Sequence, residues 1–190
     1  MSSESVESTL EDILEKYKKA FSSKIFPDES SDVDDLMLVF GLTQEIKSLN
    51  KQYWGRELGK CWERIVIETC KQRCKYFGSR IKKEQGEFCD FTIGKTAIDT
   101  KYRIGSGDSG TLAKFESDGN DLLKRGYEPV MLILRKDNLQ SAINACIKGG
   151  WTVKTGNDTY NYINEVTGFD LKSWLGMKRN HYEIKDDLET

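Results

Sequence analysis

The chain of 190 residues has the length of one domain, and its 37% hydrophobic and 32% charged residues are typical of a globular protein with a charged surface. No apolar run approaches the roughly 18 residues that a membrane span needs, and the acidic, polar first 20 residues do not resemble a secretory signal. Five cysteines, an odd number without a framework spacing, favour reduced thiols. We therefore expect a cytoplasmic protein that does not enter a membrane.

The net charge of -2 is unevenly distributed along the chain. Residues 1–35 carry ten Asp/Glu and four Lys/Arg, whereas the remaining 155 residues carry 21 acids and 25 bases. A mildly basic body of this kind could hold a phosphate backbone, although ordinary solvated faces produce balances of the same size. Charge alone therefore leaves a nucleic-acid partner open.

The first 50 residues are expected to form a helical segment. Residues 7–21 carry apolar side chains at helical spacing, namely Leu10, Ile13, Leu14, Tyr17 and Phe21. Residues 27–35, "PDESSDVDD", interrupt this pattern and are the best candidate for a linker. Asp32 or Ser31 would then cap a second helix that starts near Val33. Such a segment could dimerise the protein, contact DNA, or do both.

A long amphipathic helix is predicted from about Glu57 to Phe77. Its apolar stripe consists of Leu58, Trp62, Ile65, Val66 and Cys70. After a loop around Gly78 the apolar period changes, and residues 87–93 and 96–104 are typical of two strands joined by a turn.

The second half of the chain alternates between helical and strand patterns. A loop rich in Gly and Ser (105–110) is followed by a predicted helix over 111–126, and the apolar run 129–135 is typical of a strand buried on both faces. Further elements are predicted as a helix (138–150), a strand (151–154) and two short helices (158–168 and 170–177). We expect residues 51–190 to form an α/β core, with a mixed central sheet flanked by helices.

Two aspartates and a lysine lie on the predicted hairpin. Residues two apart in a strand share a face, so Asp99 and Lys101 lie side by side, and the turn brings Asp90 close to Asp99. Two neighbouring carboxylates favour a cation between them, and Mg²⁺ binds such oxygens together with waters and phosphate oxygens. A lysine beside them can orient a water or stabilise charge in a phosphorane-like transition state. The pattern suits metal-assisted phosphodiester hydrolysis; the alternative is that Asp99 and Lys101 are solvated neighbours.

A third acid is expected to come from the long helix. Glu63 stands at the border of the buried stripe, where it could face the sheet, while Glu57 and Glu68 are competitors on the same helix. We favour Glu63, because the small residues Gly59 and Cys61 would let the helix approach the sheet at that point.

This arrangement of acids and a lysine resembles the PD-(D/E)XK nuclease superfamily. "GKCWERIV" resembles the helical element, Asp90 the first acid and "IDTK" the (D/E)XK element, with Cys89 where a proline often precedes the first acid. Longer blocks resemble ApaLI-like type II restriction endonucleases over about residues 55–176. These blocks are "DTKYRIGSGDSGTLAKF", "GYEPVMLILRKDNLQSAINAC", "GGWTV" and "VTGFDLKSWL".

The resemblance implies a restriction-endonuclease-like fold and a Mg²⁺-dependent cut of double-stranded DNA at a short palindromic site. It implies that Asp90 and Asp99 bind the metal, with the carbonyl of Thr100 as a further ligand. Glu63 would complete or support the metal site, and Lys101 would position the attacking water. A palindrome is best recognised by a two-fold symmetric homodimer with one active site for each strand.

Candidate DNA contacts lie on two loops. The loop beside the catalytic strand offers Arg103, Ser106, Asp108, Ser109 and Thr111, and its glycines would let the backbone approach phosphate; the alternative is a plain solvent loop. The end of the buried strand offers Arg135, Lys136 and Asn138. For Asn138 we favour the role of a helix N-cap.

Other functions stay open. A structure-specific repair or junction nuclease would use the same fold, and a non-catalytic DNA-binding protein would carry the same acids in solvent. His181 is the only histidine, which argues against a histidine-based centre, and the cysteines lack the further ligands of a zinc site. No glycine-rich loop of the Walker type is present, so no nucleotide cofactor is expected.

Overall fold

The computed structural model of the protein describes residues 14–16, 18 and 32–184. Most of the helix predicted over residues 7–21 and most of the proposed linker lie outside the described residues; residues 14–16 and 18 are helical. Among the helices that the structure describes, none combines the length and the apolar character needed to span a bilayer.

Two short helices precede the long one. Helix α2 spans Asp35–Val39, and α3 spans Gln44–Leu49. The cap of α2 is Asp34, whose Oδ1 accepts hydrogen bonds from the amides of Leu36 and Met37 at 3.1 and 3.0 Å. The predicted cap at Asp32 or Ser31 is therefore wrong, because the side chain that reaches the free amides of the first turn is that of Asp34.

Helix α4 spans Lys51–Arg73, so it begins and ends earlier than predicted. It starts after Asn50, whose side chain caps the amide of Tyr53 at 3.0 Å. The predicted apolar stripe is confirmed: its fully buried members recur every four residues at Leu58, Trp62, Val66 and Cys70. The helix ends at Cys74, where the backbone becomes extended and leads directly into the sheet.

The sheet has five strands in the order β1-β2-β3-β4-β5. The strands are β1 (Phe77–Lys82), β2 (Glu87–Ile93), β3 (Thr96–Lys101), β4 (Glu128–Ile133) and β5 (Thr152–Thr155). The first two pairs are antiparallel and the last two are parallel. The mixed sheet is therefore confirmed, and so are the hairpin and the strand positions over 129–135 and 151–154, within a residue or two.

Strand β1 was not predicted, because Gly78, its second residue, suggests a loop. The strand needs glycine there: a Cβ on Gly78 would lie 2.3 Å from the hydroxyl oxygen of Thr92 on β2. β1 is also an edge strand with half-exposed and exposed residues, so its sequence lacks the apolar alternation of the inner strands.

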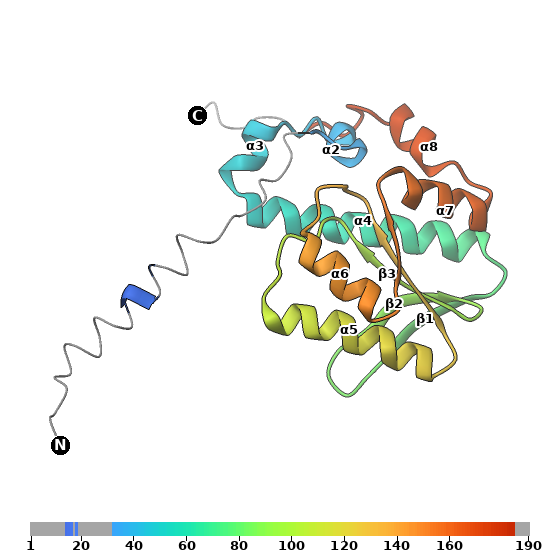
Figure 1. The fold of residues 1–190 in the computed structure, drawn as a ribbon. Helices are drawn as coiled ribbons and strands as arrows, with labels where there is room; N and C mark the ends of the chain where they lie inside the picture. Colours follow the sequence, from blue (N-terminus) through green and yellow to red (C-terminus); the bar gives the residue numbers. More distant parts are fainter. Residues whose placement is uncertain (1–13, 17, 19–31, 185–190) are drawn as a thin grey trace, which may run out of the picture.

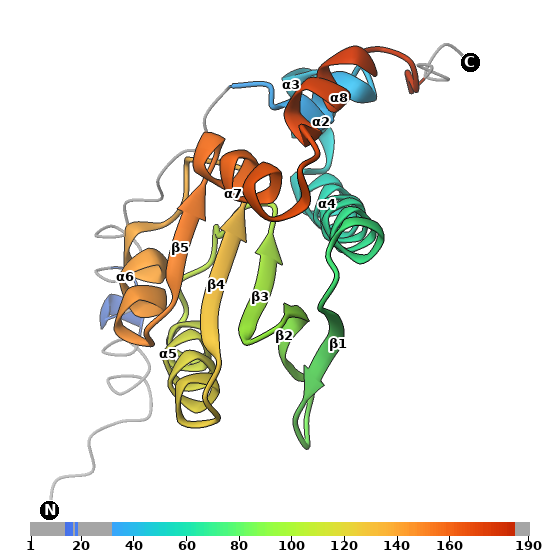
Figure 2. The ribbon, with the colours of Figure 1, turned by 90° about the vertical axis from the view of Figure 1, so that its right-hand side faces the viewer.

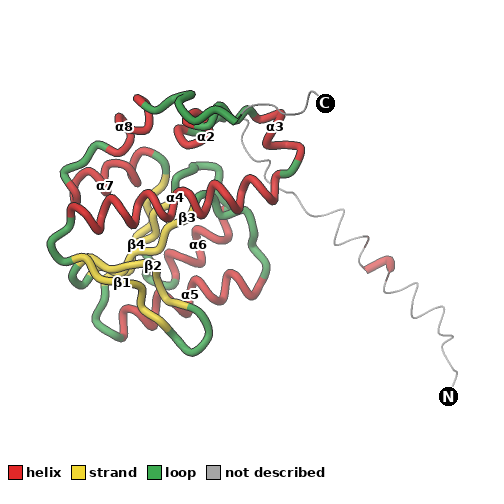
Figure 3. Tube along the Cα trace, turned by 180° about the vertical axis from the view of Figure 1, so that it is seen from behind, coloured by secondary structure: helices red, strands yellow, loops and turns green. Residues whose placement is uncertain are grey.

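Helices cover both faces of the sheet (Figure 1). Figure 2 shows α5 (Ser109–Lys124) and α6 (Gln140–Lys148) on one face and α4 on the other. Helix α7 (Asn157–Thr167) packs with α4, while α8 (Leu171–Met177) gathers with α2 and α3 at one end of the molecule. In the view from behind, α4 runs across the sheet, where it contacts β1, β2 and β3 (Figure 3).

Two apolar clusters fill the layers on either side of the sheet. Ile98 and Tyr102 belong to the cluster that packs under α4, together with Trp62. Ala97 and Met131 belong to the cluster beneath α5 and α6. Strand β3 therefore turns alternate residues to opposite helical layers, as its sequence predicts.

Candidate active site

The predicted site lies where strands β2 and β3 part. Their ladder runs Ile93–Thr96, Thr92–Ala97 and Phe91–Ile98, and in the described chain it ends there. Beyond this point the Asp90 side chain replaces the backbone pairing. Its Oδ2 accepts hydrogen bonds from the backbone amide of Thr100 at 2.6 Å and from the Thr100 hydroxyl at 2.7 Å. The carboxylate of Asp90 is thus buried and fixed against the neighbouring strand.

Asp99 and Lys101 lie side by side on β3, as expected from their spacing. The ammonium of Lys101 donates to Oδ2 of Asp99 in a short ion pair, and to the backbone carbonyl of Thr100 at 3.2 Å. The side chain of Asp99 is mostly buried and that of Lys101 about one third exposed. The three residues form a compact unit at the end of β3 in which the cation bridges two oxygen acceptors.

One cavity of about 210 Å³ collects the residues expected to be catalytic. Glu63 reaches it from α4, Asp90 from β2, and Asp99 and Lys101 from β3. The competing acids of α4 lie elsewhere and have local partners. Glu57 binds Arg56 and Lys60, and Glu68 binds Gln72 and Lys71. The choice of Glu63 therefore agrees with its position on the cavity wall.

Burial sets the protonation behaviour of Asp99. Removal from water raises the pKa of this carboxyl to about 6, and the negative charge of Asp90 adds to the increase. The ammonium groups of Lys101 and Lys114 oppose it but do not cancel it. In a fraction of the molecules Asp99 is therefore protonated near neutral pH, and a further positive charge nearby would reduce that fraction.

Glu63 and Lys101 respond to the same neighbours. Burial, followed by the charge of Asp90, raises the pKa of Glu63 above its usual range. Burial alone would lower the pKa of Lys101, but Asp99, Asp90 and Glu63 together outweigh it and leave that pKa raised. The four groups therefore act as one electrostatic unit, and Lys101 is protonated at neutral pH.

The cavity holds more acids than bases. Lining acids are Glu63, Glu87, Asp90, Asp99 and Asp118, against Lys101 and Lys114. Two of the acids have cations of their own, because Arg80 pairs with Glu87 at 2.7 Å and Lys83 pairs with Asp118. Glu63 makes no ion pair or hydrogen bond within the part of the chain that the structure describes. The remaining negative charge and the oxygen-only donor set fit a hard divalent cation.

The acids do not form a ready-made metal site. Within residues 14–16, 18 and 32–184, no group of three or more His, Cys, Asp or Glu side chains is arranged to hold a metal ion. Two of the expected ligands, the Asp99 carboxylate and the Thr100 carbonyl, instead bind the Lys101 ammonium. The ammonium therefore competes with a metal ion for these two acceptors.

The loop expected to contact DNA is organised around Asp108. This residue caps helix α5: its Oδ1 accepts from the amide of Thr111 at 3.0 Å, and its Oδ2 accepts from the hydroxyls of Thr111 and Ser106 at 2.7 and 2.9 Å. These hydrogen bonds hold the pKa of Asp108 at about 2. Ser109 is the first residue of the helix. Ser106, Asp108 and Ser109 are exposed, and a DNA contact from this loop stays a prediction.

Two arginines among the candidate contacts are held inside the protein. Arg135 is only 4% exposed and pairs with Asp34 at 3.0 Å and with Asp137 at 2.7 Å. Arg103 donates to the backbone carbonyl of Asp137 at 2.9 Å and to its carboxylate at 3.1 Å. Arg135 thus joins the start of α2 to the segment after β4, and Arg103 joins the segment after β3 to the same segment. Lys136, by contrast, is exposed.

Asn138 does not cap a helix. Its Oδ1 accepts from the amide of Ile104 at 2.8 Å, and its Nδ2 donates to the carbonyl of Arg135 at 2.7 Å. The N-cap position of α6 is Leu139, which offers no side-chain hydrogen bond. The prediction of an N-cap is wrong, because the side chain joins two backbone segments and is not available to the first turn of the helix.

Several cavity residues were not anticipated from the sequence. Lys114 and Asp118 reach the cavity from α5, and Trp151 reaches it from the position just before β5. Lys114 and Asp118 are four residues apart, and this spacing on the helix that follows the catalytic strand was a usable signal. The position of Trp151 depends on the packing of α5 against α6, where its Nε1 donates to the carbonyl of Phe115 at 2.8 Å, and no local pattern indicates it.

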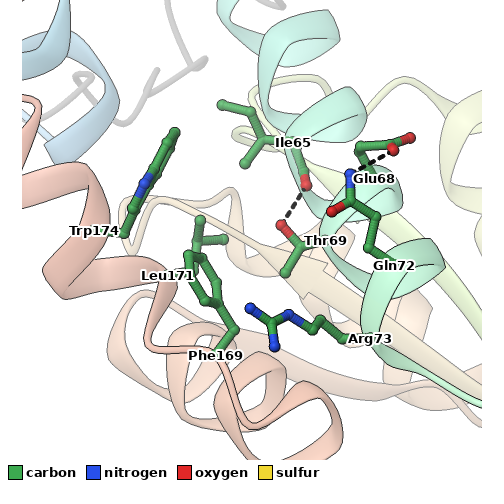
Figure 4. A pocket seen from close by; sticks show the side chains of 8 residues that line it. All are labelled: Ile65, Glu68, Thr69, Gln72, Arg73, Phe169, Leu171 and Trp174. Carbon is green, nitrogen blue, oxygen red and sulfur yellow. Dashed lines mark hydrogen bonds between the residues drawn. The ribbon is translucent and has the colours of Figure 1, made fainter.

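A second cavity of about 300 Å³ lies between α4 and the segment that leads into α8 (Figure 4). It is lined by Ile65, Glu68, Thr69, Gln72, Arg73, Phe169, Leu171 and Trp174. Its polar groups are paired locally: the hydroxyl of Thr69 donates to the carbonyl of Ile65 at 2.7 Å, and Arg73 lies over the ring of Phe169. Only one acid lines it, so it does not compete as a catalytic centre.

The cavity beside β3 is therefore the strongest candidate site in the described chain. It brings acids from a helix and two strands together with a protonated lysine, and it opens at the end of a parallel strand pair. Comparison of the chain with models of protein families, with curated proteins and with solved structures finds no match.

Proposed function

We propose that the protein is a Mg²⁺-dependent type II restriction endonuclease, which hydrolyses phosphodiester bonds of double-stranded DNA at a short palindromic site. The observation that carries the proposal is the gathering of Glu63, Asp90, Asp99 and Lys101 around one cavity. The proposal includes a restriction-endonuclease-like core and a homodimer. For these two features the support is the resemblance of residues 55–176 and the symmetry of a palindromic target.

The acids of the cavity would hold the metal. Asp90 and Asp99 offer carboxylates, Thr100 its carbonyl, and Glu63 a further carboxylate without a partner in the described chain. Mg²⁺ bound there supplies a Lewis acid for a phosphate oxygen and makes a bound water more acidic. The double hydrogen bond from Thr100 fixes the orientation of Asp90 before any ligand arrives.

Lys101 acts through its positive charge, because the neighbouring carboxylates keep it protonated. Because Asp99, Asp90 and Glu63 raise its pKa, its ammonium is unsuited to removing a proton from water at neutral pH. It can instead donate hydrogen bonds that position the attacking water, and it can offset the negative charge that develops on the phosphate in the transition state.

The experiment is a digest of a plasmid of known sequence with and without Mg²⁺, followed by mapping of the ends. Discrete fragments that appear only with Mg²⁺ are expected. Cutting confined to branched or mismatched substrates would support the structure-specific nuclease instead, and DNA binding without any cutting would support a non-catalytic protein.

Variants connect this activity to the cavity. Asp90→Asn and Lys101→Ala should each abolish cleavage while binding of duplex DNA survives. Glu63→Gln should weaken cleavage, and Glu165→Gln is its matched control, since it makes the same change at an exposed position of α7 that does not line the cavity. Full cutting by Asp90→Asn or by Lys101→Ala would show that the site is wrongly assigned.

A further inference from the structure

A larger hollow adjoins the acidic cavity. Its volume is about 610 Å³, and it is lined by Lys60, Glu63, Arg64, Ile67, Glu68 and Arg80. Glu63 lines both spaces. The ion pair between Arg80 and Glu87 also joins them, because Arg80 belongs to the hollow and Glu87 to the cavity. We call this space the outer hollow; it adjoins the candidate active site at Glu63.

The outer hollow differs from the cavity in its charge. Lys60 and Arg64 stand four residues apart on α4 and so share a face, and Arg80 faces them from β1. Lys60 binds Glu57 at 3.1 Å, and Arg80 binds Glu87 at 2.7 Å. The residues that line the hollow carry three positive and two negative charges, whereas those of the neighbouring cavity carry five negative and two positive charges.

Arg64 is the residue that the fold leaves unexplained. Its side chain is exposed, and within the described part of the chain it makes no hydrogen bond or ion pair. It lines the outer hollow, and the residue before it, Glu63, lines both spaces. An exposed, unpaired guanidinium at this position is free to bind a planar group of oxygens such as phosphate.

We propose that the outer hollow binds a backbone phosphate that neighbours the scissile one, with Arg64 as the principal contact and Lys60 and Arg80 beside it. This inference rests on the proposed nuclease function. A nucleic-acid strand carries a charge at each 3.4 Å or so of helix axis, so a strand that enters the acidic cavity must place further phosphates on its rim. The basic outer hollow supplies the counter-charge on the α4 side of that rim.

The test measures how DNA binding depends on salt. The full chain carries Asp90→Asn, which blocks cleavage, and binding of a labelled duplex is measured over a range of salt concentrations. Adding Lys60→Gln and Arg64→Gln should lower the affinity and make the slope of log K against log salt shallower by about 0.9 for each phosphate that the protein no longer neutralises. Both residues are exposed on a helix, and glutamine is a good helix former, so the fold is retained.

The matched control carries Lys124→Gln and Lys148→Gln in the same background. These lysines are exposed on α5 and α6, away from the outer hollow, and the control changes the net charge by the same amount. A shallower slope in the outer-hollow variant alone supports the inference. Equal slopes in both variants, or an unchanged slope, overturn it while leaving the nuclease proposal intact.

Failure of the Asp90→Asn chain to bind duplex DNA at any salt concentration would overturn the proposed function, and this inference with it. A second measurement uses the cleaving protein. Arg64→Gln alone should raise KM for DNA and leave kcat unchanged, because a contact to a phosphate that does not itself react binds the ground state and the transition state alike. A fall in kcat with an unchanged KM would contradict a role in phosphate binding.

Discussion

Thr100 holds Asp90 with two hydrogen bonds, one from its backbone amide at 2.6 Å and one from its hydroxyl at 2.7 Å, and both reach the same carboxylate oxygen. Both residues are buried, Asp90 at 8% and Thr100 at 5% exposure. The pair lies just beyond the last ladder pair of β2 and β3, so it holds the separating strands together with side-chain hydrogen bonds. A structural link and a candidate metal ligand therefore depend on one interaction.

Thr100→Val should weaken both the link between strands β2 and β3 and the fixed position of the Asp90 carboxylate. Valine keeps the shape of the side chain but removes the hydroxyl donor, and removal of a hydrogen bond to a buried charge lowers the free energy of unfolding by about 1–3 kcal/mol. Urea denaturation measures this decrease, and cleavage should fall as Asp90 becomes less ordered. Thr100→Ser, which retains the hydroxyl, is the control and should remain close to wild type. Equal stability of the two variants would show that the hydroxyl contributes nothing.

The raised pKa of Asp99 predicts a stability that falls as pH rises. The carboxyl of Asp99 binds its proton more tightly in the folded protein than in the unfolded chain. Its contribution to the free energy of unfolding is therefore complete below about pH 4 and is lost as pH rises through about 6. With a chelator present to remove metal ions, the wild type should therefore lose stability relative to Asp99→Asn as pH rises from about 4 to about 6. Parallel curves of unfolding free energy against pH for the two proteins would contradict the shift.

The sequence predicted best where local pattern decides the structure. The stripe of α4 and the apolar run of β4 are buried as predicted, because periodicity reports which face meets the core. The edge strand β1 was missed because glycine is typical of loops. Gly78 belongs to the strand because it lies close to Thr92 on β2, which the sequence does not reveal. Arg135 was expected at the surface, but its burial depends on Asp34, about a hundred positions away in the sequence, which local pattern does not indicate.

The candidate site divides in the same way. Alternation along β3 was enough to place Asp99 beside Lys101. The small residues of α4 led to Glu63, which lines the cavity, and its part in catalysis stays a prediction. The hydrogen bond from the Lys101 ammonium to the Thr100 carbonyl could not be predicted from the sequence. It depends on side-chain rotamers and on the competition among charges within the cavity. Lys114 comes from an element whose distance from the site is set by the βαβ crossover.

Mg²⁺ should stabilise the wild-type protein, because a ligand that binds only the folded state adds about 2.7 kcal/mol at a concentration one hundred times its Kd. Thermal unfolding with and without Mg²⁺ measures the change in Tm and needs no DNA. Asp90→Asn and Asp99→Asn should remove the change, while Glu68→Gln, outside the cavity, should keep it. If Mg²⁺ still increases the Tm of both aspartate variants, the ion binds outside the cavity that Asp90 and Asp99 line.

Arg135 and its neighbour Lys136 should separate structural from DNA-binding roles. Arg135→Gln removes the cation that pairs with Asp34, while Asp137 keeps its ion pair with Arg103, and breaking such a buried pair lowers the free energy of unfolding by about 3–5 kcal/mol. Lys136→Gln changes an exposed side chain, so stability should stay near wild type while affinity for duplex DNA falls. Urea denaturation and a DNA titration are run on both variants at a temperature where Arg135→Gln remains folded. If folded Arg135→Gln binds DNA more weakly than Lys136→Gln does, the guanidinium reaches DNA despite its burial, and its structural assignment is incomplete.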